Sequence, residues 1–175
     1  VIFSKEFKRL MAATLSPLAR VSDQAPTDDD VRRAMELLFF AYRDFIAEPD
    51  NLLTELEFGR AHHRVIHFVG RNPGITVSEL LGILKITKQS LGRVLGQLID
   101  KGIVRQDPGA RDKRHRHLTL TDEGRALELR VSADQRKRIA EAFATVGPDA
   151  VAGFERVLRA MVIDPADLVR LDRAK

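Results

Sequence analysis

The sequence predicts a mainly α-helical fold with a minor β component. Apolar residues recur at helical spacing in long segments such as 31–46, 56–69 and 121–143. Two short runs, 103–107 and 115–120, have the character of strands, and turn-forming residues separate them. The chain has 175 residues, of which 44% are hydrophobic, so it can bury one substantial core. We therefore expect one helical domain that contains a β-hairpin, with long helices extending from it.

The run from Thr87 to Lys101 carries the most information about function. It reads TKQSLGRVLGQLIDK, and Thr87 is a good N-cap for a helix. Its apolar residues fall on one face and are expected to be buried, namely Leu91, Val94, Leu95, Leu98 and Ile99. The opposite face carries amide, hydroxyl and cationic side chains, and no acidic residue occurs before Asp100. Such a face suits a groove that is lined with phosphates and base edges.

The segments on either side of this run complete a winged helix-turn-helix. Upstream, Thr76 and Glu79 match the S/T-x-x-E capping box at the start of a short helix, 76–84. Only a short turn separates this helix from the next one, as in a helix-turn-helix. Downstream, Gly102 ends the second helix, and the expected hairpin with its basic tip forms a wing.

These features together resemble the MarR family of transcriptional regulators. The resemblance rests on PGITVSELLGIL, on TKQSLGRVLGQLIDKGIV, on the D-x-R pair of Asp112 and Arg114, and on the closing LTLTDEGRAL. It extends over roughly positions 31–163, and the order and spacing of the motifs make it specific. The resemblance implies a homodimer that pairs through its terminal helices, binds double-stranded DNA and most often represses transcription. It also implies a small-molecule effector. Because a two-fold dimer presents two recognition helices, we expect the operator to be an inverted repeat.

The positive charge of the chain is concentrated in this module. The formal net charge is +4, yet the segment from Lys85 to His117 contains nine lysines and arginines against three aspartates. The rest of the chain is therefore slightly acidic. A basic module on an acidic body is the electrostatic pattern of a DNA-binding protein, although a charge-rich surface is often merely solvated.

The predicted DNA contacts divide between the second helix and the wing. Gln89 and Arg93 lie four residues apart on the exposed face, where Gln pairs well with adenine and Arg with guanine. At the wing tip, we expect Arg114 to enter the minor groove and Asp112 to hold a neighbouring arginine in place. The exposed face also carries two glycines, which would allow either a close approach of DNA or packing against another segment. The complete predicted contact set is Thr87, Lys88, Gln89, Ser90, Arg93, Arg111, Asp112, Lys113, Arg114 and Arg116.

We expect the remaining helices to form the dimer. The predicted parts are an N-terminal extension, a dimerisation helix, the DNA-binding module and C-terminal dimerisation helices, at residues 1–26, 27–55, 56–124 and 125–175 respectively. Thr27 caps the first confident helix, which should end at a turn over 48–51, and the last helix should end at Asp164-Pro165. The helix after Thr27 has more apolar surface than one small core would cover. It is either wholly buried or a dimer contact, and we favour the dimer.

A histidine cluster, AHHRVIH, offers two further interpretations. His63 and His67 lie four residues apart and could share a metal on one helix face, with His62 beside them. A metal-responsive regulator is therefore an alternative, but the sequence nearby lacks the other ligands of a closed site, so no metal or cofactor is assigned. The other interpretation is an effector pocket, which by analogy with the family would involve Phe39, Tyr42, Arg43, Phe58, His62 and Arg64.

Other classes of protein fit the sequence less well. It contains no G-x-G-x-x-G after a strand, P-loop, G-x-S-x-G, H-E-x-x-H or cysteine nucleophile, so we do not expect an enzyme. The absence of cysteine also excludes thiol redox sensing. No apolar stretch is long enough to span a membrane, and we expect a cytoplasmic protein. A winged helix that binds a protein instead of DNA remains an alternative.

Overall fold

The structure is a computed structural model that describes residues 25–108 and 116–173. The chain divides into two compact units inside helix α2 (Asp28–Glu55), since the first unit ends at Phe40 and the second begins at Ala41. In the first unit, α2 starts at the predicted cap. The Thr27 hydroxyl oxygen accepts a hydrogen bond from the Asp30 N–H at 3.2 Å. The predicted N-terminal extension lies almost entirely outside the described residues.

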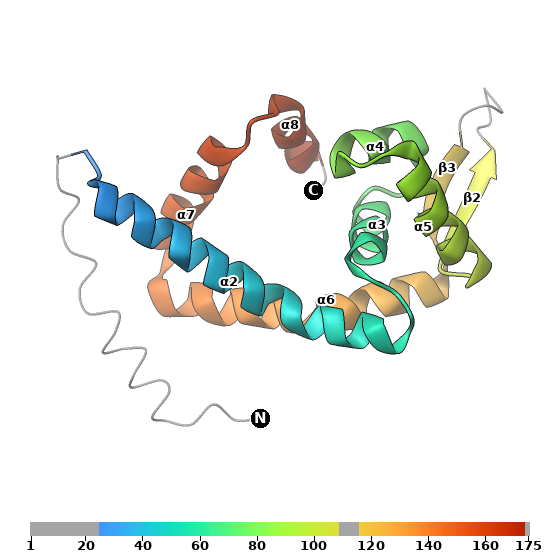
Figure 1. The fold of residues 1–175 in the computed structure, drawn as a ribbon, viewed down its shortest axis with the longest axis horizontal. Coiled ribbons are helices and arrows are strands. Elements are labelled where there is room, and N and C mark those ends of the chain that lie inside the picture. The colour runs from blue at the N-terminus through green and yellow to red at the C-terminus, as the bar shows by residue number, and fades with distance from the viewer. Residues whose placement is uncertain (1–24, 109–115, 174–175) are drawn as a thin grey trace. The chain divides into compact units, whose positions relative to one another are not determined.

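The second unit contains the rest of α2 and all the other described elements (Figure 1). In chain order these are α3 (Arg60–Arg71), β1 (Ile75–Thr76), α4 (Val77–Leu84), α5 (Lys88–Asp100), β2 (Val104–Pro108), β3 (Arg116–Leu120), α6 (Asp122–Val146), α7 (Pro148–Met161) and α8 (Pro165–Arg173). The predicted helix-turn-helix is α4 with α5, and the predicted wing is β2 with β3. The mainly α-helical fold with a small β component is thus confirmed. Among the described helices, none combines the length and the apolar character that a membrane crossing needs.

A three-stranded antiparallel sheet forms the base of the wing. The central strand is β3, which pairs Leu118 with Ile75 of β1 and Leu120 with Val104 of β2. Leu118 and Leu120 are buried, as the alternation of the sequence predicts. The sequence does not predict β1, because two residues are too few to show a strand pattern.

The hydrophobic core of the second unit lies among α3, α5, α6 and the sheet. Its members from the three helices include Val65, Ile66, Val69, Leu91, Leu95, Leu98, Leu127 and Val131. These residues are the inward faces that helical spacing predicts. Because α5 gives one face to this core, its other face is left to the solvent.

Threonine caps fix the starts of three helices in this unit, and two of them, Thr76 and Thr87, are named above from the sequence. The Thr76 hydroxyl accepts from the Glu79 N–H at 3.2 Å, and the Glu79 carboxylate accepts from the Thr76 N–H at 2.8 Å. The Thr87 hydroxyl accepts from the Ser90 N–H at 3.1 Å, and Thr121 caps α6 in the same way. Each cap satisfies an N–H group that the helix itself leaves unpaired.

Helix α2 continues through the turn that the sequence predicts at 48–51, so that prediction is wrong. Pro49 lies inside the helix, where it has no N–H to donate to the carbonyl of Phe45. Gln135 of α6 donates to that carbonyl instead, with its Nε2 3.1 Å from the Phe45 oxygen. The side chain of a distant helix thus replaces the hydrogen bond that proline removes.

Two other helix boundaries also differ from the prediction. Helix α3 begins at Arg60, later than expected, because Glu57 adopts a left-handed conformation with a φ of 60° just after α2. Helix α8 follows Asp164-Pro165, where the sequence predicts the last helix to end. Pro165 occupies the first position of α8, which tolerates proline because that N–H needs no partner within the helix.

Helix α2 is not wholly buried in its own chain. In the described structure Met35 is 66% exposed and Phe39 is 62% exposed. The other large apolar residues of this stretch are exposed as well, namely Val31, Leu37, Leu38, Phe40 and Tyr42. The alternative of a completely buried first helix is therefore wrong. The apolar surface that the predicted dimer contact requires is exposed, and the contact itself stays a prediction.

Candidate nucleic-acid interface

Helix α5 has one buried face and one exposed face. On the buried face, no side chain of the set Leu91, Val94, Leu95 and Leu98 is more than 5% exposed. Ile99, which the sequence places with them, is only partly buried because it lies in the last turn. The exposed face carries the predicted helix contacts, Lys88, Gln89, Ser90 and Arg93. The core thus holds the helix while these side chains remain free to meet another surface.

A buried histidine joins the start of α3 to α5. The His62 side chain is 8% exposed, and its Nδ1 accepts a hydrogen bond from the Gly59 N–H at 3.0 Å. The proton of the neutral ring is then on Nε2, which donates to Gln97 Oε1 at 2.8 Å. Phe58 stacks on the imidazole with the ring centroids 4.8 Å apart. Nδ1 therefore contacts the start of α3 and Nε2 contacts α5, so both ring nitrogens already have partners within the chain.

Two glycines on the exposed face of α5 have open space beside them. No atom lies within 4 Å of the position that a Cβ would take at Gly92 or at Gly96. Packing against another described segment therefore does not explain either glycine. A glycine inside a helix costs about 1 kcal/mol relative to alanine, and the open space here would admit the close approach of an external surface.

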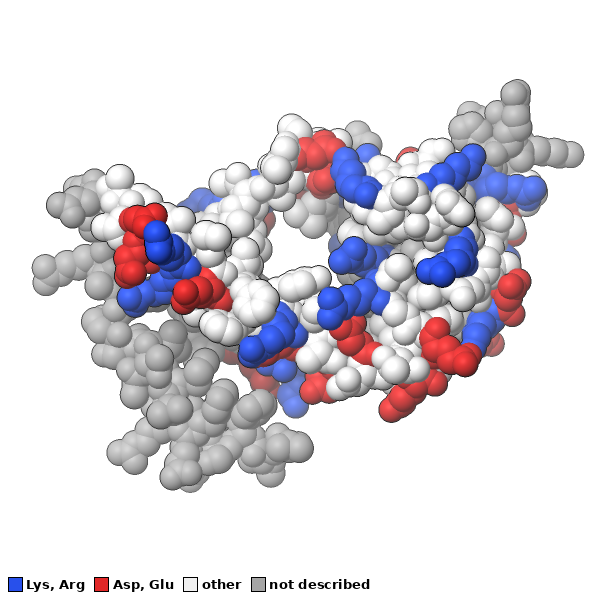
Figure 2. All heavy atoms as spheres, in the orientation of Figure 1, with Lys and Arg blue, Asp and Glu red and all other residues white. Residues whose placement is uncertain are grey.

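The cations around α5 fall into two groups. Three of them pair within the chain, Lys85 with Asp164 at 2.6 Å, Lys101 with Glu57 at 3.2 Å and Arg105 with Asp107 at 2.8 Å. Lys88 and Arg93, by contrast, form no ion pair with any residue in the described ranges. On the visible face over α4 and α5, Lys and Arg side chains stand among uncharged atoms (Figure 2). Lys88 and Arg93 both lie on the exposed face of α5.

The structure describes the wing only at its base. Arg116 begins β3 opposite Pro108 of β2, and it is exposed. The other predicted wing contacts, Arg111, Asp112, Lys113 and Arg114, lie outside the described residues. The arrangement of the D-x-R pair therefore stays a prediction.

The L-T-x-x-G segment locks the wing to α6. The Thr121 hydroxyl accepts a hydrogen bond from the Gly124 N–H at 3.0 Å and donates to the Gly102 carbonyl at 2.6 Å. A Cβ at Gly124 would lie 2.1 Å from the carbonyl oxygen of Ile103, so only glycine fits without movement of the backbone. The Thr121 hydrogen bonds and the close approach of Gly124 to Ile103 fix the base of the wing against the residues that follow α5.

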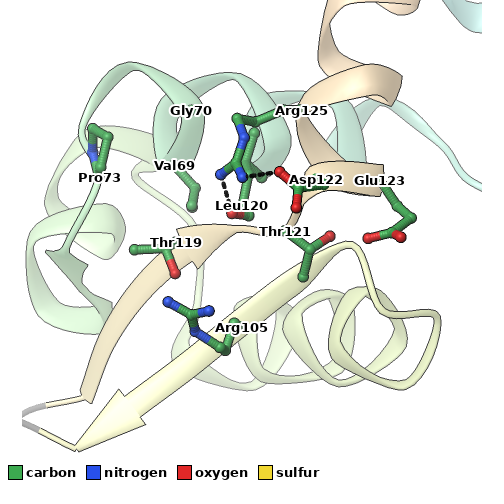
Figure 3. Close-up of a pocket in the computed structure, with 10 residues that line it drawn as sticks. All are labelled: Val69, Gly70, Pro73, Arg105, Thr119, Leu120, Thr121, Asp122, Glu123 and Arg125. Carbon is green, nitrogen blue, oxygen red and sulfur yellow. Dashed lines mark hydrogen bonds and ion pairs between the residues drawn. The ribbon is translucent and has the colours of Figure 1, made fainter.

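A cavity of about 320 Å³ lies beside this junction (Figure 3). Arg105 of β2 and Arg125 of α6 contribute to its walls, and the Thr119 hydroxyl is buried with no hydrogen-bond partner among the described residues. Arg125 donates to the Leu120 carbonyl at 2.8 Å and pairs with Asp122. Because both arginines are already paired within the chain, we assign no anionic ligand to this cavity.

The residues predicted for an effector pocket are divided between the two units of the chain. Phe58 lines a cavity of about 490 Å³ together with Glu55, Leu56, Glu57, Lys101, Ile103 and Leu127. Tyr42, Arg43, His62 and Arg64 are not among the residues that line it. Arg43 pairs with Asp44 at 2.8 Å, and Phe39 belongs to the first unit. The effector pocket therefore stays a prediction.

His63 and His67 lie in a partly charged environment between α3 and α6. His67 Nδ1 is 3.9 Å from Glu128 Oε1, and Arg136 pairs with the same carboxylate at 3.2 Å. Partial burial lowers the pKa of both His63 and His67 from its ordinary value. Within the residues that the structure describes, no three side chains of metal-binding type are grouped in a way that could hold an ion. The metal-responsive alternative thus has no site there.

Two contacts that position α5 and the turn before it connect residues far apart in the sequence. Gln97 lies 35 positions from His62, and Asp164 lies 79 positions from Lys85. No local pattern relates either pair. The sequence marks Gln97 only as a polar residue at the border of an apolar stripe, and Asp164 only as a helix-end signal.

The helix-turn-helix of α4 and α5, together with the β2–β3 wing, defines the winged helix-turn-helix class. A sequence profile of the MarR family matches residues 57–115. The HTH-type transcriptional regulator PetP of Rhodobacter capsulatus is 54% identical over 140 residues, which cover 80% of this chain and 84% of PetP. The chain belongs to the MarR family of transcriptional regulators, and it is not an enzyme.

Solved structures share the fold. A mutant MarR from E. coli in complex with operator DNA is 22% identical with a TM-score of 0.57, and the match covers 79% of this chain and 99% of that one. FabT from Streptococcus pneumoniae in complex with DNA is 20% identical with a TM-score of 0.67, with the same coverage of 79% and 99%. At these identities the similarity establishes the architecture.

Proposed function

We propose that this regulator binds an inverted-repeat operator in double-stranded DNA as a homodimer and represses transcription. The observation that carries the proposal is α5, whose buried face anchors it while Lys88, Gln89 and Arg93 are exposed and the two cations have no ion pair with a described residue. In a helix-turn-helix the second helix lies in the major groove with its N-terminal residues toward the base edges. The MarR and FabT structures contain DNA, which supports the same role here.

Within α5 we assign base reading and phosphate binding to different residues. Gln89 and Arg93 are four residues apart on one exposed face, and each can form a bidentate pair worth about 1–3 kcal/mol of base discrimination. Thr87, Lys88 and Ser90 lie at the N-terminus of the helix, where the helix dipole also favours a phosphate. Phosphate contacts fix the register of the protein on DNA, and base contacts provide sequence specificity.

We also assign the wing to DNA, with Arg111, Asp112, Lys113, Arg114 and Arg116 as its contacts. Arg114 enters the minor groove, and Asp112 holds a neighbouring arginine in one rotamer. The change Arg114→Ala is expected to weaken operator binding strongly while folding and dimerisation stay intact. A gel-shift titration measures the first effect, and sedimentation measures the second. Unchanged affinity would remove the wing from the mechanism.

Homodimerisation is assigned to residues 27–55 and 125–175, which flank the DNA-binding module at 56–124. Helices α6 and α7 expose Leu129, Ile139, Phe143, Val146, Phe154, Val157, Leu158 and Met161. Exposed apolar surface of this kind marks interaction sites. A two-fold dimer places two copies of α5 about one turn of DNA apart, so the operator is an inverted repeat.

We further propose that a small-molecule effector releases the DNA. A ligand that binds better to a dimer with altered spacing between its two α5 helices would lower operator affinity, since binding of ligand and of DNA are then thermodynamically coupled. The cavity lined by Phe58 and Lys101 supports this proposal because Lys101 directly follows α5. Competition of candidate small molecules with operator DNA tests it.

Selection of bound sequences from random duplex DNA tests the central proposal. We expect the enriched sequences to form an inverted repeat, and binding to weaken steeply as salt rises because phosphate contacts release counterions. A winged helix that binds proteins would enrich no sequence and would bind DNA weakly or not at all. Enrichment of a single, asymmetric site would overturn the two-fold arrangement.

A further inference from the structure

An ion pair joins helix α8 to the helix-turn-helix. Lys85 Nζ donates to Asp164 Oδ2 at 2.6 Å. Lys85 ends α4 in a left-handed conformation, with a φ of 52°. Asp164 precedes α8 and accepts a hydrogen bond from the Ala166 N–H at 3.0 Å, so it caps that helix. The pair thus connects the turn between α4 and α5 to the start of α8.

Further contacts keep α8 beside α4, as Figure 1 shows. The Arg170 guanidinium of α8 lies 3.5 Å from the position that a Cβ would take at Gly82 of α4. At the other end of α8, Asp172 pairs with Arg159 of α7. Asp164 is therefore held near Lys85 by the position of its helix as well as by charge.

Lys85 is also placed where a phosphate contact is expected. It lies in the turn two residues before Thr87, the cap of α5. In helix-turn-helix complexes the first helix crosses the DNA backbone and the second enters the groove, so the turn between them lies near phosphates. The Lys85 side chain is 59% exposed, which leaves the ammonium group accessible from solvent.

In the free protein the Asp164 carboxylate is paired with the Lys85 ammonium group. The Lys85 ammonium, together with the Ala166 N–H, lowers the pKa of Asp164 from its ordinary value, so the carboxylate is charged at neutral pH. Asp167 adds negative charge near Lys85, and Arg170 offsets part of it. A phosphate that approaches Lys85 therefore competes with the Asp164 carboxylate for the same positive charge.

We propose that Lys85 is a further phosphate-binding residue of the DNA interface and that Asp164 masks it in the free protein. This inference rests on the proposed DNA-binding function. Because exposed ion pairs are weak, a phosphate can replace the carboxylate at a small cost. Asp164 therefore lowers affinity for any duplex, while base reading by α5 is unchanged.

The variant Asp164→Asn tests the inference, because asparagine removes the charge but still caps a helix. Fluorescence anisotropy of the full chain with a labelled duplex of mixed sequence, over a salt series, measures both affinity and its salt dependence. We expect binding to tighten about two- to fivefold, which is the range for release of one exposed ion pair. The slope of log affinity against log salt should also steepen, because the unaltered protein must take up a cation at Asp164 when phosphate displaces that carboxylate, and the variant does not. Asp164→Ser, with a second capping residue, should give the same result.

Asp172→Asn is the matched control, since it makes the same charge change in the same helix but at a carboxylate that pairs with Arg159. It should leave the salt slope unchanged. Adding Lys85→Met to Asp164→Asn should abolish the gain. The inference is overturned if Asp164→Asn changes neither quantity, if Asp172→Asn acts equally, or if the gain survives Lys85→Met. Salt-insensitive binding by the unaltered protein would instead contradict the proposed function itself.

Discussion

At the scale of single residues, Gly92 and Gly124 should respond to alanine in opposite ways. Gly92→Ala meets open space on the exposed face of α5, so it should stabilise the fold by up to about 1 kcal/mol and weaken operator binding. Gly124→Ala brings a Cβ to 2.1 Å from the Ile103 carbonyl oxygen and should cost about 1–3 kcal/mol of folding free energy. Urea denaturation measures both stabilities. If Gly92→Ala is more stable and binds the operator equally well, DNA does not approach that glycine closely.

Arg93 and Lys88 should differ in the kind of affinity that they provide. Arg93→Lys keeps the charge but loses the planar, two-pronged donor, so it should lose about 1–3 kcal/mol of discrimination between the operator and a scrambled duplex. Lys88→Ala should weaken both duplexes alike and reduce the salt slope by about 1. Parallel titrations of the two duplexes separate these effects. Equal losses on both duplexes for Arg93→Lys would show that Arg93 contacts phosphate instead of a base.

At the scale of elements, the continuity of α2 depends on a side chain from α6. Gln135→Ala leaves the Phe45 carbonyl without the partner that Pro49 makes necessary, and should cost about 0.5–1.5 kcal/mol of folding free energy. Pro49→Ala restores the backbone N–H that donates to Phe45 in an uninterrupted helix. In that background Gln135→Ala should therefore cost less. A double-mutant cycle that shows additive effects would contradict this account.

The same elements show which features the sequence can predict. The caps at Thr76, Thr87 and Thr121 depend on residues within three positions, so local pattern suffices to find them. The Phe45 carbonyl, which Pro49 leaves without an N–H, and the Asp164 carboxylate both have partners on distant helices. No local pattern contains such partners, so the sequence predicts only helix ends at Pro49 and Asp164. The exposed face of α5 follows from the spacing of its apolar residues. By contrast, the His62–Gln97 and Lys85–Asp164 contacts, which hold α5 and the turn before it, depend on the tertiary fold alone.

At the scale of the whole molecule, the proposed function combines a limited general attraction to DNA with a few contacts that read its sequence. Lys88 and Arg93 of α5 form no ion pair with a described residue, whereas the neighbouring Lys85, Lys101 and Arg105 have carboxylate partners. Internal pairing limits the sequence-independent attraction that many phosphate contacts would create. Specificity then depends on few base contacts per helix. In the proposed function, a second copy of α5 is therefore needed to recognise an operator among many competing sites.

The proposed dimer can be tested by changing the exposed apolar face of α7. Val157 and Met161 lie four residues apart on one helix face and are 59% and 56% exposed. The double change Val157→Lys and Met161→Lys places two charges on this apolar face. If the face pairs with a second copy, the chain should become monomeric and should lose most of its affinity for the inverted repeat while it keeps weak binding to a half-site. Sedimentation and anisotropy measure these two outcomes.

Ala152→Lys, on a different face of α7 and also exposed, is the control and should leave the dimer intact. A dimer that survives the double change would exclude this face of α7 from the interface, because two buried, unpaired lysines would not be tolerated there.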